Sequence, residues 1–166
     1  MRFALGVVVG AVAVGLAALL RPFSIQELQP RLVYNGGDER RLAELSDHVL
    51  RGQVVGRQGQ TTHSTTDLPL TLWTVDVHAT YKGDLPETIT VAQIGGYEPF
   101  SNTLKLIDDD ALLRVMGEYV LAVNHDVEND RYRLMPKYGD IRLPNGPPED
   151  LAAVDAHWRS VTAPEP

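Results

Sequence analysis

The histidines of this 166-residue chain are spaced as isolated side chains rather than as a metal centre. No two lie two or four positions apart and no His-Glu-x-x-His pattern occurs, so the usual zinc-binding spacing is missing. The five are His48, His63, His78, His125 and His157. A metal site at His63, His125 and Asp126 would require two hairpin tips to meet. We therefore favour solvated loop histidines and predict no metal site.

The acidic run Asp108, Asp109 and Asp110 is the other cluster with the right chemistry for a cation. Calcium loops alternate their oxygen ligands along the chain and place a glycine at the sharp turn. Three adjacent aspartates lack that spacing. We interpret the run as a helix cap or an exposed acidic turn.

The sequence also gives little support for an activated serine nucleophile. None of the serines (Ser24, Ser46, Ser64, Ser101 and Ser160) lies in a Gly-x-Ser-x-Gly turn. Gly95 and Gly96 lack the lysine and the following helix of a phosphate-binding loop. We predict no catalytic residue and no cofactor. The segment that holds Gly95, Gly96, Tyr97 and Phe100 is instead a candidate interaction loop.

Composition excludes several classes of protein. The chain has no cysteine, which rules out a disulfide scaffold, a thiolate zinc site and an iron–sulfur cluster. The net charge is −7, whereas a protein that follows nucleic-acid phosphates needs positive charge. We therefore expect no nucleic-acid partner.

The first 22 residues contain an apolar segment from Phe3 to Leu20 without a single polar side chain. As a helix its 18 residues would span roughly 27 Å, close to the ~30 Å hydrocarbon core of a bilayer. Three interpretations compete. We favour an uncleaved membrane anchor over a secretory signal cleaved after Gly15-x-Ala17, and both over a buried core helix.

The orientation of this segment is a conflict within the sequence. Arg21, Arg31, Arg40 and Arg41 follow it, whereas only Arg2 and the amino terminus precede it, which by the positive-inside rule favours a cytoplasmic domain. An N-terminal apolar segment directly after a basic residue is, however, the usual export signal. We expect a membrane-anchored protein with an extracytoplasmic domain, with a cleaved and secreted form as the alternative.

Small residues in the anchor suggest a packing surface. Gly6 and Gly10 are four positions apart, as are Ala11 and Gly15. This spacing places small side chains on one side of a helix and lets a second transmembrane helix approach closely. We predict that these four residues face another helix, which would make the membrane segment one route to a protein partner.

The rest of the chain alternates short strands with turns. Period-two alternation from Leu70 to Lys82 is the clearest strand, and the apolar run 119–125 fits a central strand. The pattern also predicts strands over 49–57, 88–94, 131–135 and 141–143, a loop over 58–67, and an irregular stretch over 97–113 with a short helical turn after Asp108. Helices are expected over 39–48, capped by Asp38, and over 149–161.

These elements predict a mainly β protein, a small antiparallel barrel or sandwich with a short C-terminal helix. The expected organisation is an anchor or signal at 1–22, a linker at 23–39, a β-rich domain at 40–161 and a disordered tail at 162–166.

The order of motifs resembles a loose group of small exported bacterial proteins of unknown function. The resemblance rests on Ser46-Asp-x-Val49-x-x-Gly52-x-Val54, a long alternating strand ending in Lys82-Gly83, and Gly117-Glu-Tyr-Val-Leu121. It extends, more distantly, to the netrin-like barrel, a relative of the OB-fold. The resemblance implies that fold and an exported location. It supplies no catalytic residue, because the N-terminal cysteine of netrin-like inhibitors is absent.

From these observations we expect a non-catalytic, membrane-tethered extracytoplasmic module that binds or stabilises part of a surface or membrane protein assembly. The alternative is an exported hydrolase, or an inhibitor of one, with its site on the loop 97–113. Both hypotheses place residues 3–20 at the membrane during export.

Overall fold

The computed structural model describes residues 22–29, 38–63, 65–108, 110–144 and 148–164. The helices are α2 (Glu39–Leu45) and α3 (Pro148–Thr162), with a 3₁₀ turn η1 (Val127–Asn129). The strands are β1 (Ser24–Leu28), β2 (His48–Thr62), β3 (Pro69–Lys82), β4 (Thr88–Ile94), β5 (Gly96–Glu98), β6 (Thr103–Ile107), β7 (Glu118–Asp126), β8 (Arg131–Leu134) and β9 (Asp140–Arg142). The mainly β class and the C-terminal helix are confirmed.

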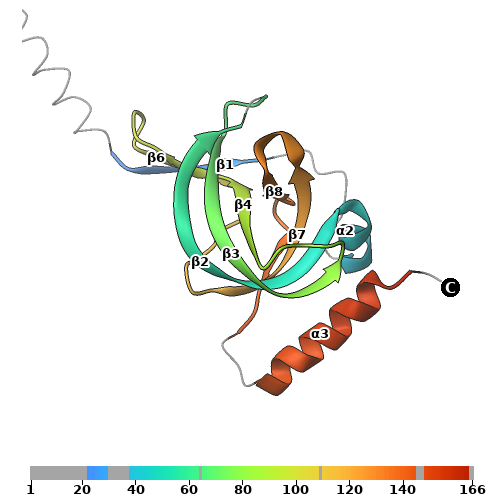
Figure 1. The fold of residues 1–166 in the computed structure, drawn as a ribbon. Coiled ribbons are helices and arrows are strands. Elements are labelled where there is room, and N and C mark those ends of the chain that lie inside the picture. The colour runs from blue at the N-terminus through green and yellow to red at the C-terminus, as the bar shows by residue number, and fades with distance from the viewer. Residues whose placement is uncertain (1–21, 30–37, 64, 109, 145–147, 165–166) are drawn as a thin grey trace, which may run out of the picture.

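Two sheets make up the β structure. In the larger sheet β2 pairs with β3, β3 with β4, β4 with β8 and β8 with β7, and β7 pairs again with β2. All of these contacts are antiparallel except β4–β8, which is parallel. The smaller sheet has the order β1-β6-β5. Figure 1 shows β2 and β3 as two long curved strands side by side, with α3 and the β1–β6 pair at opposite ends of the molecule.

Apolar side chains on the two faces of β2 and β7 form two separate cores. Leu50 and Leu121 pack with Trp73 and Val75 between the strands of the larger sheet. Val49 and Val120 point the other way, into a second core shared with α2 and α3. β7 is therefore buried on both faces, which is why its sequence is apolar without alternation.

Glycines allow β2 to pair with both β3 and β7. The register with β3 shifts between Arg51 and Gly52, and a Cβ at position 52 would lie 2.5 Å from the carbonyl oxygen of Asp76. Only glycine fits that close approach. The shifts bend β2, and a bent strand can pair along both of its edges.

Four details of the sequence interpretation are wrong. The lead-in at 23–39 contains strand β1, which pairs with β6 far along the chain. The loop expected at 58–67 begins only after Thr62, because β2 continues as a strand. The stretch 97–113 contains strands β5 and β6, and no helix in the described residues begins at Asp108. Thr162 belongs to α3 rather than to a tail, and its hydroxyl donates to the carbonyl of Tyr81 at 2.9 Å.

Within the described ranges, no helix is long and apolar enough to cross a membrane. The segment 3–20 and the packing residues Gly6, Gly10, Ala11 and Gly15 lie outside the described residues.

Candidate functional site

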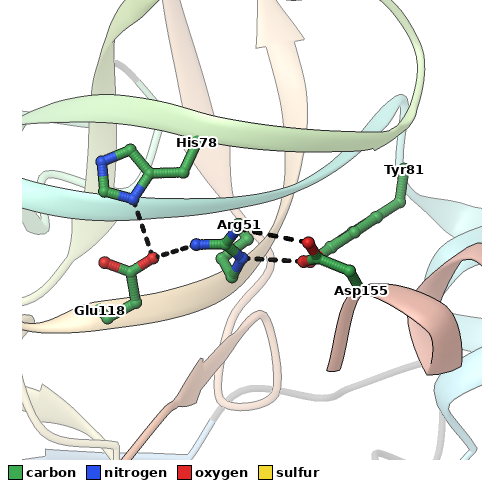
Figure 2. Close-up of polar contacts among 5 residues, drawn as sticks. All are labelled: Arg51, His78, Tyr81, Glu118 and Asp155. Atoms are coloured by element: carbon green, nitrogen blue, oxygen red, sulfur yellow. Dashed lines mark hydrogen bonds and ion pairs between the residues drawn. The ribbon is translucent and has the colours of Figure 1, made fainter. Parts of the chain in front are cut away.

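A charged cluster joins α3 to the larger sheet. Arg51 on β2 donates from Nη1 to Glu118 at 2.7 Å and from Nε to Asp155 at 2.9 Å, and Tyr81 donates to the same carboxylate at 2.6 Å. His78 Nδ1 lies 2.9 Å from Glu118 Oε1. Figure 2 shows the guanidinium between the two carboxylates, with Asp155 coming from the helix.

This cluster is charged, and the Arg51, Glu118 and Asp155 side chains in it are each less than a fifth exposed. Hydrogen bonds from Arg51 hold the pKa of Asp155 below its usual value, and burial raises the pKa of Tyr81. The Arg51 side chain is 12% exposed, so its charge depends on both carboxylates for compensation. The arrangement positions α3 against the larger sheet.

A second polar site lies in a pocket of about 300 Å³ between the segment 110–114 and the turn before β9. Its lining comprises Asp110, Ala111, Leu112, Arg114, Tyr119, Lys137, Tyr138, Asp140 and Arg142. The buried amide of Gln93 shapes one wall, because it donates to the carbonyl of Ala111 at 3.0 Å and accepts from the Leu113 N–H at 2.9 Å.

Asp110 and Asp140 form a hydrogen-bonded carboxyl pair in this pocket. Burial, together with the neighbouring Asp110, raises the pKa of Asp140 to about 8. Burial also raises the pKa of Asp110, although the Lys137 N–H donates to this carboxylate at 3.2 Å. Two close carboxyls cannot both ionise at low cost, so the pair retains a proton near neutral pH. Such a pair can donate and accept protons.

The residues of the acidic run have roles that the sequence interpretation missed. Asp108 forms an ion pair with the Lys137 ammonium group, whereas Asp110 belongs to the carboxyl pair. Asp109 lies outside the described residues. The pairing of Asp110 with Asp140 could not be found from spacing, because the two positions meet only through the β7–β8–β9 fold.

The histidines considered for a metal site have other neighbours. The ring of His63 accepts from the Thr65 N–H at 3.3 Å, and His125 stacks on Tyr132 at 4.7 Å between ring centroids. Asp126 instead binds Asn129 and Arg131. Across the described residues, no group of three or more histidine, aspartate or glutamate side chains could hold a metal ion.

The candidate interaction loop divides into a buried and an exposed part. Gly95 and Gly96 are buried where the chain leaves β4 for the smaller sheet, and Gly95 has a φ of +125° that favours glycine. The side chain of Gln60 accepts from the Tyr97 N–H at 3.0 Å and donates to the Tyr97 carbonyl at 2.9 Å, which ties β5 to β2. Tyr97 and Phe100 are exposed, Phe100 by 88%.

No protein-family model matches the chain, and the search among curated proteins found no significant match.

Proposed function

We propose that the protein is a membrane-tethered extracytoplasmic accessory module that binds a protein partner and catalyses no reaction. The observation that carries this proposal is the place of β1. It begins at Ser24, four residues after the apolar segment ends at Leu20, and it pairs over its whole length with β6. Residues 3–20 are the membrane anchor in this proposal.

The short connection limits how far the domain can lie from the bilayer. Four residues extend at most about 14 Å, since an extended chain advances ~3.4 Å per residue. Strand β1 is also bonded to the body: the Ser24 N–H donates to the Asn102 carbonyl at 3.1 Å, and the Asp108 N–H donates to the Leu28 carbonyl at 2.8 Å. A tether of this kind holds the domain beside the membrane surface.

The fold in this proposal is a small five-stranded barrel of the OB or netrin-like type. The sequence of pairings from β2 through β3, β4, β8 and β7 back to β2 supports it, as does the parallel β4–β8 contact. Barrels of this type often act as binding modules through one sheet face and the loops beside it. The resemblance to small exported bacterial proteins agrees with this role.

The partner contact is proposed to include the membrane segment. Gly6, Gly10, Ala11 and Gly15 form a small-residue surface of the kind that allows close helix packing. A protein held beside the membrane with such a surface is suited to a membrane protein assembly.

Location is tested by labelling with a membrane-impermeant maleimide. The chain has no cysteine, so Ala156→Cys on the exposed side of α3 introduces a single thiol. In intact spheroplasts of a bacterial host the variant should be labelled as fully as in lysed cells. Labelling only after lysis would place the domain in the cytoplasm and contradict the proposal.

Function is tested by extraction in a mild detergent followed by affinity purification. A stoichiometric membrane-protein partner is the expected result. Recovery of a lone monomer that turns over substrates on a hydrolase panel would overturn the accessory role.

A second candidate function is favoured by the carboxyl pair. Asp110 lies on the loop 97–113 that the hydrolase hypothesis singles out, and it meets Asp140 in the pocket beside Arg114, Lys137 and Arg142. A protonated and an ionised carboxyl together provide general acid and base, and the cations would suit an anionic substrate. Under this alternative Asp140→Asn abolishes hydrolysis while the fold is retained.

A further inference from the structure

The outward face of the smaller sheet is apolar at the end where β1 begins, and Glu27 shares this face further along β1. Cross-strand register places Ile25 opposite Leu104, and Leu104 opposite Tyr97, so these three side chains share one face. On the other face Thr103 and Ile107 are buried against the body. Phe23 and Ile25 are each more than half exposed. We call the set Phe23, Ile25, Tyr97, Phe100 and Leu104 the outer patch.

The turn between β5 and β6 holds Phe100 outward. Tyr97 donates its hydroxyl proton to Asn102 at 2.7 Å across the turn. Glu98 accepts from the Ser101 hydroxyl at 2.6 Å and from the Lys105 ammonium at 3.1 Å. A turn braced in this way presents its aromatic tip without further ordering on contact.

The outer patch lies at the end of the sheet where the anchor joins. β1 and β6 run parallel from Ser24 and Thr103, so the start of β1 is beside the β5–β6 turn, as Figure 1 shows. The hydroxyls of Ser24 and Thr103 are 2.9 Å apart. Phe100, in the β5–β6 turn, therefore lies close to the start of β1, which follows the apolar segment.

We propose that the outer patch inserts into the lipid headgroup region and holds the domain against the bilayer. This inference rests on the proposed function, because it requires residues 3–20 to be inserted. The headgroup region is about 5–8 Å deep on each side of the hydrocarbon core, less than the ~14 Å that the chain can extend from Leu20 to Ser24. Tyr is enriched at this depth because its ring is amphipathic, and Phe adds apolar area that is buried at the boundary between headgroups and acyl chains.

The test is fluorescence quenching of the full chain reconstituted into phosphatidylcholine vesicles with brominated acyl chains. The variants Phe100→Trp and Ile25→Trp place a reporter on the outer patch. Gln26→Trp, on the neighbouring position of β1, and Ala156→Trp, on α3, are the matched controls. The two native tryptophans are buried, and the parent chain corrects for them.

Brominated lipid should quench the two patch reporters severalfold more than either control. Insertion is established in the same vesicles by resistance to alkaline carbonate extraction. If the chain is inserted and Phe100→Trp is quenched no more than Ala156→Trp, the patch proposal is overturned while the anchor stands.

Two other outcomes would also overturn the inference. If neither brominated lipid nor aqueous iodide reaches the patch reporters, a second copy of the chain covers the patch instead of lipid. If carbonate releases the chain, the anchor itself fails, and the patch proposal fails with it.

Discussion

At the scale of single residues, Asp140 makes stability depend on pH. Its pKa of about 8 in the folded protein lies above the value near ~3.9 expected in the unfolded chain. The folded state therefore retains a proton that the unfolded chain has released. The stabilisation is complete below about pH 4 and is lost as the pH rises through about 8.

We predict that Asp140→Asn removes this loss. Between pH 5 and pH 8 the wild type should lose up to about 1.4 kcal/mol of unfolding free energy per pH unit relative to the variant. Urea unfolding at four pH values measures the difference. The exposed control Asp84→Asn should follow the wild type, and parallel curves for all three proteins would mean that Asp140 is not shifted.

Arg51 supports a prediction about the charged cluster. Arg51→Met keeps the length of the side chain but leaves Glu118 and Asp155 as largely buried carboxylates without their cation. The unfolding free energy should fall by about 3 kcal/mol, because removing one partner of a buried ion pair leaves the other charge buried without compensation.

The matched control is Arg41→Met, which removes an ion pair with Glu44 whose two side chains are each 53% exposed. A loss of at most about 0.5 kcal/mol is expected there. Both variants are compared by urea unfolding. Equal losses of unfolding free energy would show that the Arg51 cluster contributes no more to stability than a surface ion pair.

At the scale of the elements, β3 presents two unlike faces. Val75 is completely buried in the first core, whereas Thr80 on the same strand is exposed. We predict that Val75→Asp destabilises the protein by about 4 kcal/mol, because it buries an unpaired carboxylate. Thr80→Asp should change stability by no more than about 0.5 kcal/mol. Thermal unfolding of both variants is the measurement, and similar losses would argue that both faces of β3 are buried throughout.

Element ends are fixed by side chains from other elements. The Lys82 ammonium group donates to the carbonyls of Ala43 and Ser46 at 2.8 and 2.6 Å, which caps the C-terminal end of α2. Asp47 accepts from the His125 N–H at 3.0 Å and donates its own N–H to Asn124 at 2.8 Å. Residues of the Ser-Asp and Lys-Gly motifs therefore have structural roles.

At the scale of the whole molecule, the anchor is proposed to associate with another transmembrane helix. Gly6→Ile together with Gly10→Ile keeps the segment apolar, so insertion should be preserved while helix association weakens. A crosslinking assay in membranes measures association. Unchanged association of the double variant would exclude the small-residue surface, and a mature N-terminus at Ala18 would exclude the anchor.

The sequence by itself determined the class of this protein and its main elements. Apolar periodicity is a local property, so the β3 alternation, the apolar run of β7 and the one-sided face of α3 could be predicted from neighbouring residues. Polar composition led to a wrong prediction where the strand's pairing partner is distant in the sequence. Gln58 and Gln60 read as loop residues, yet both lie in β2. Gln60 pairs with Thr71 of β3, because ladder hydrogen bonds do not depend on side-chain polarity.

Only the tertiary structure decided which residues meet. Arg51 and Asp155 are 104 positions apart, and Ser24 and Thr103 are 79 apart, so neither contact leaves a trace in local spacing. The carboxyl pair of Asp110 and Asp140 is hidden for the same reason. Its raised pKa values arise from burial and from proximity, and both are consequences of the tertiary fold rather than of any motif.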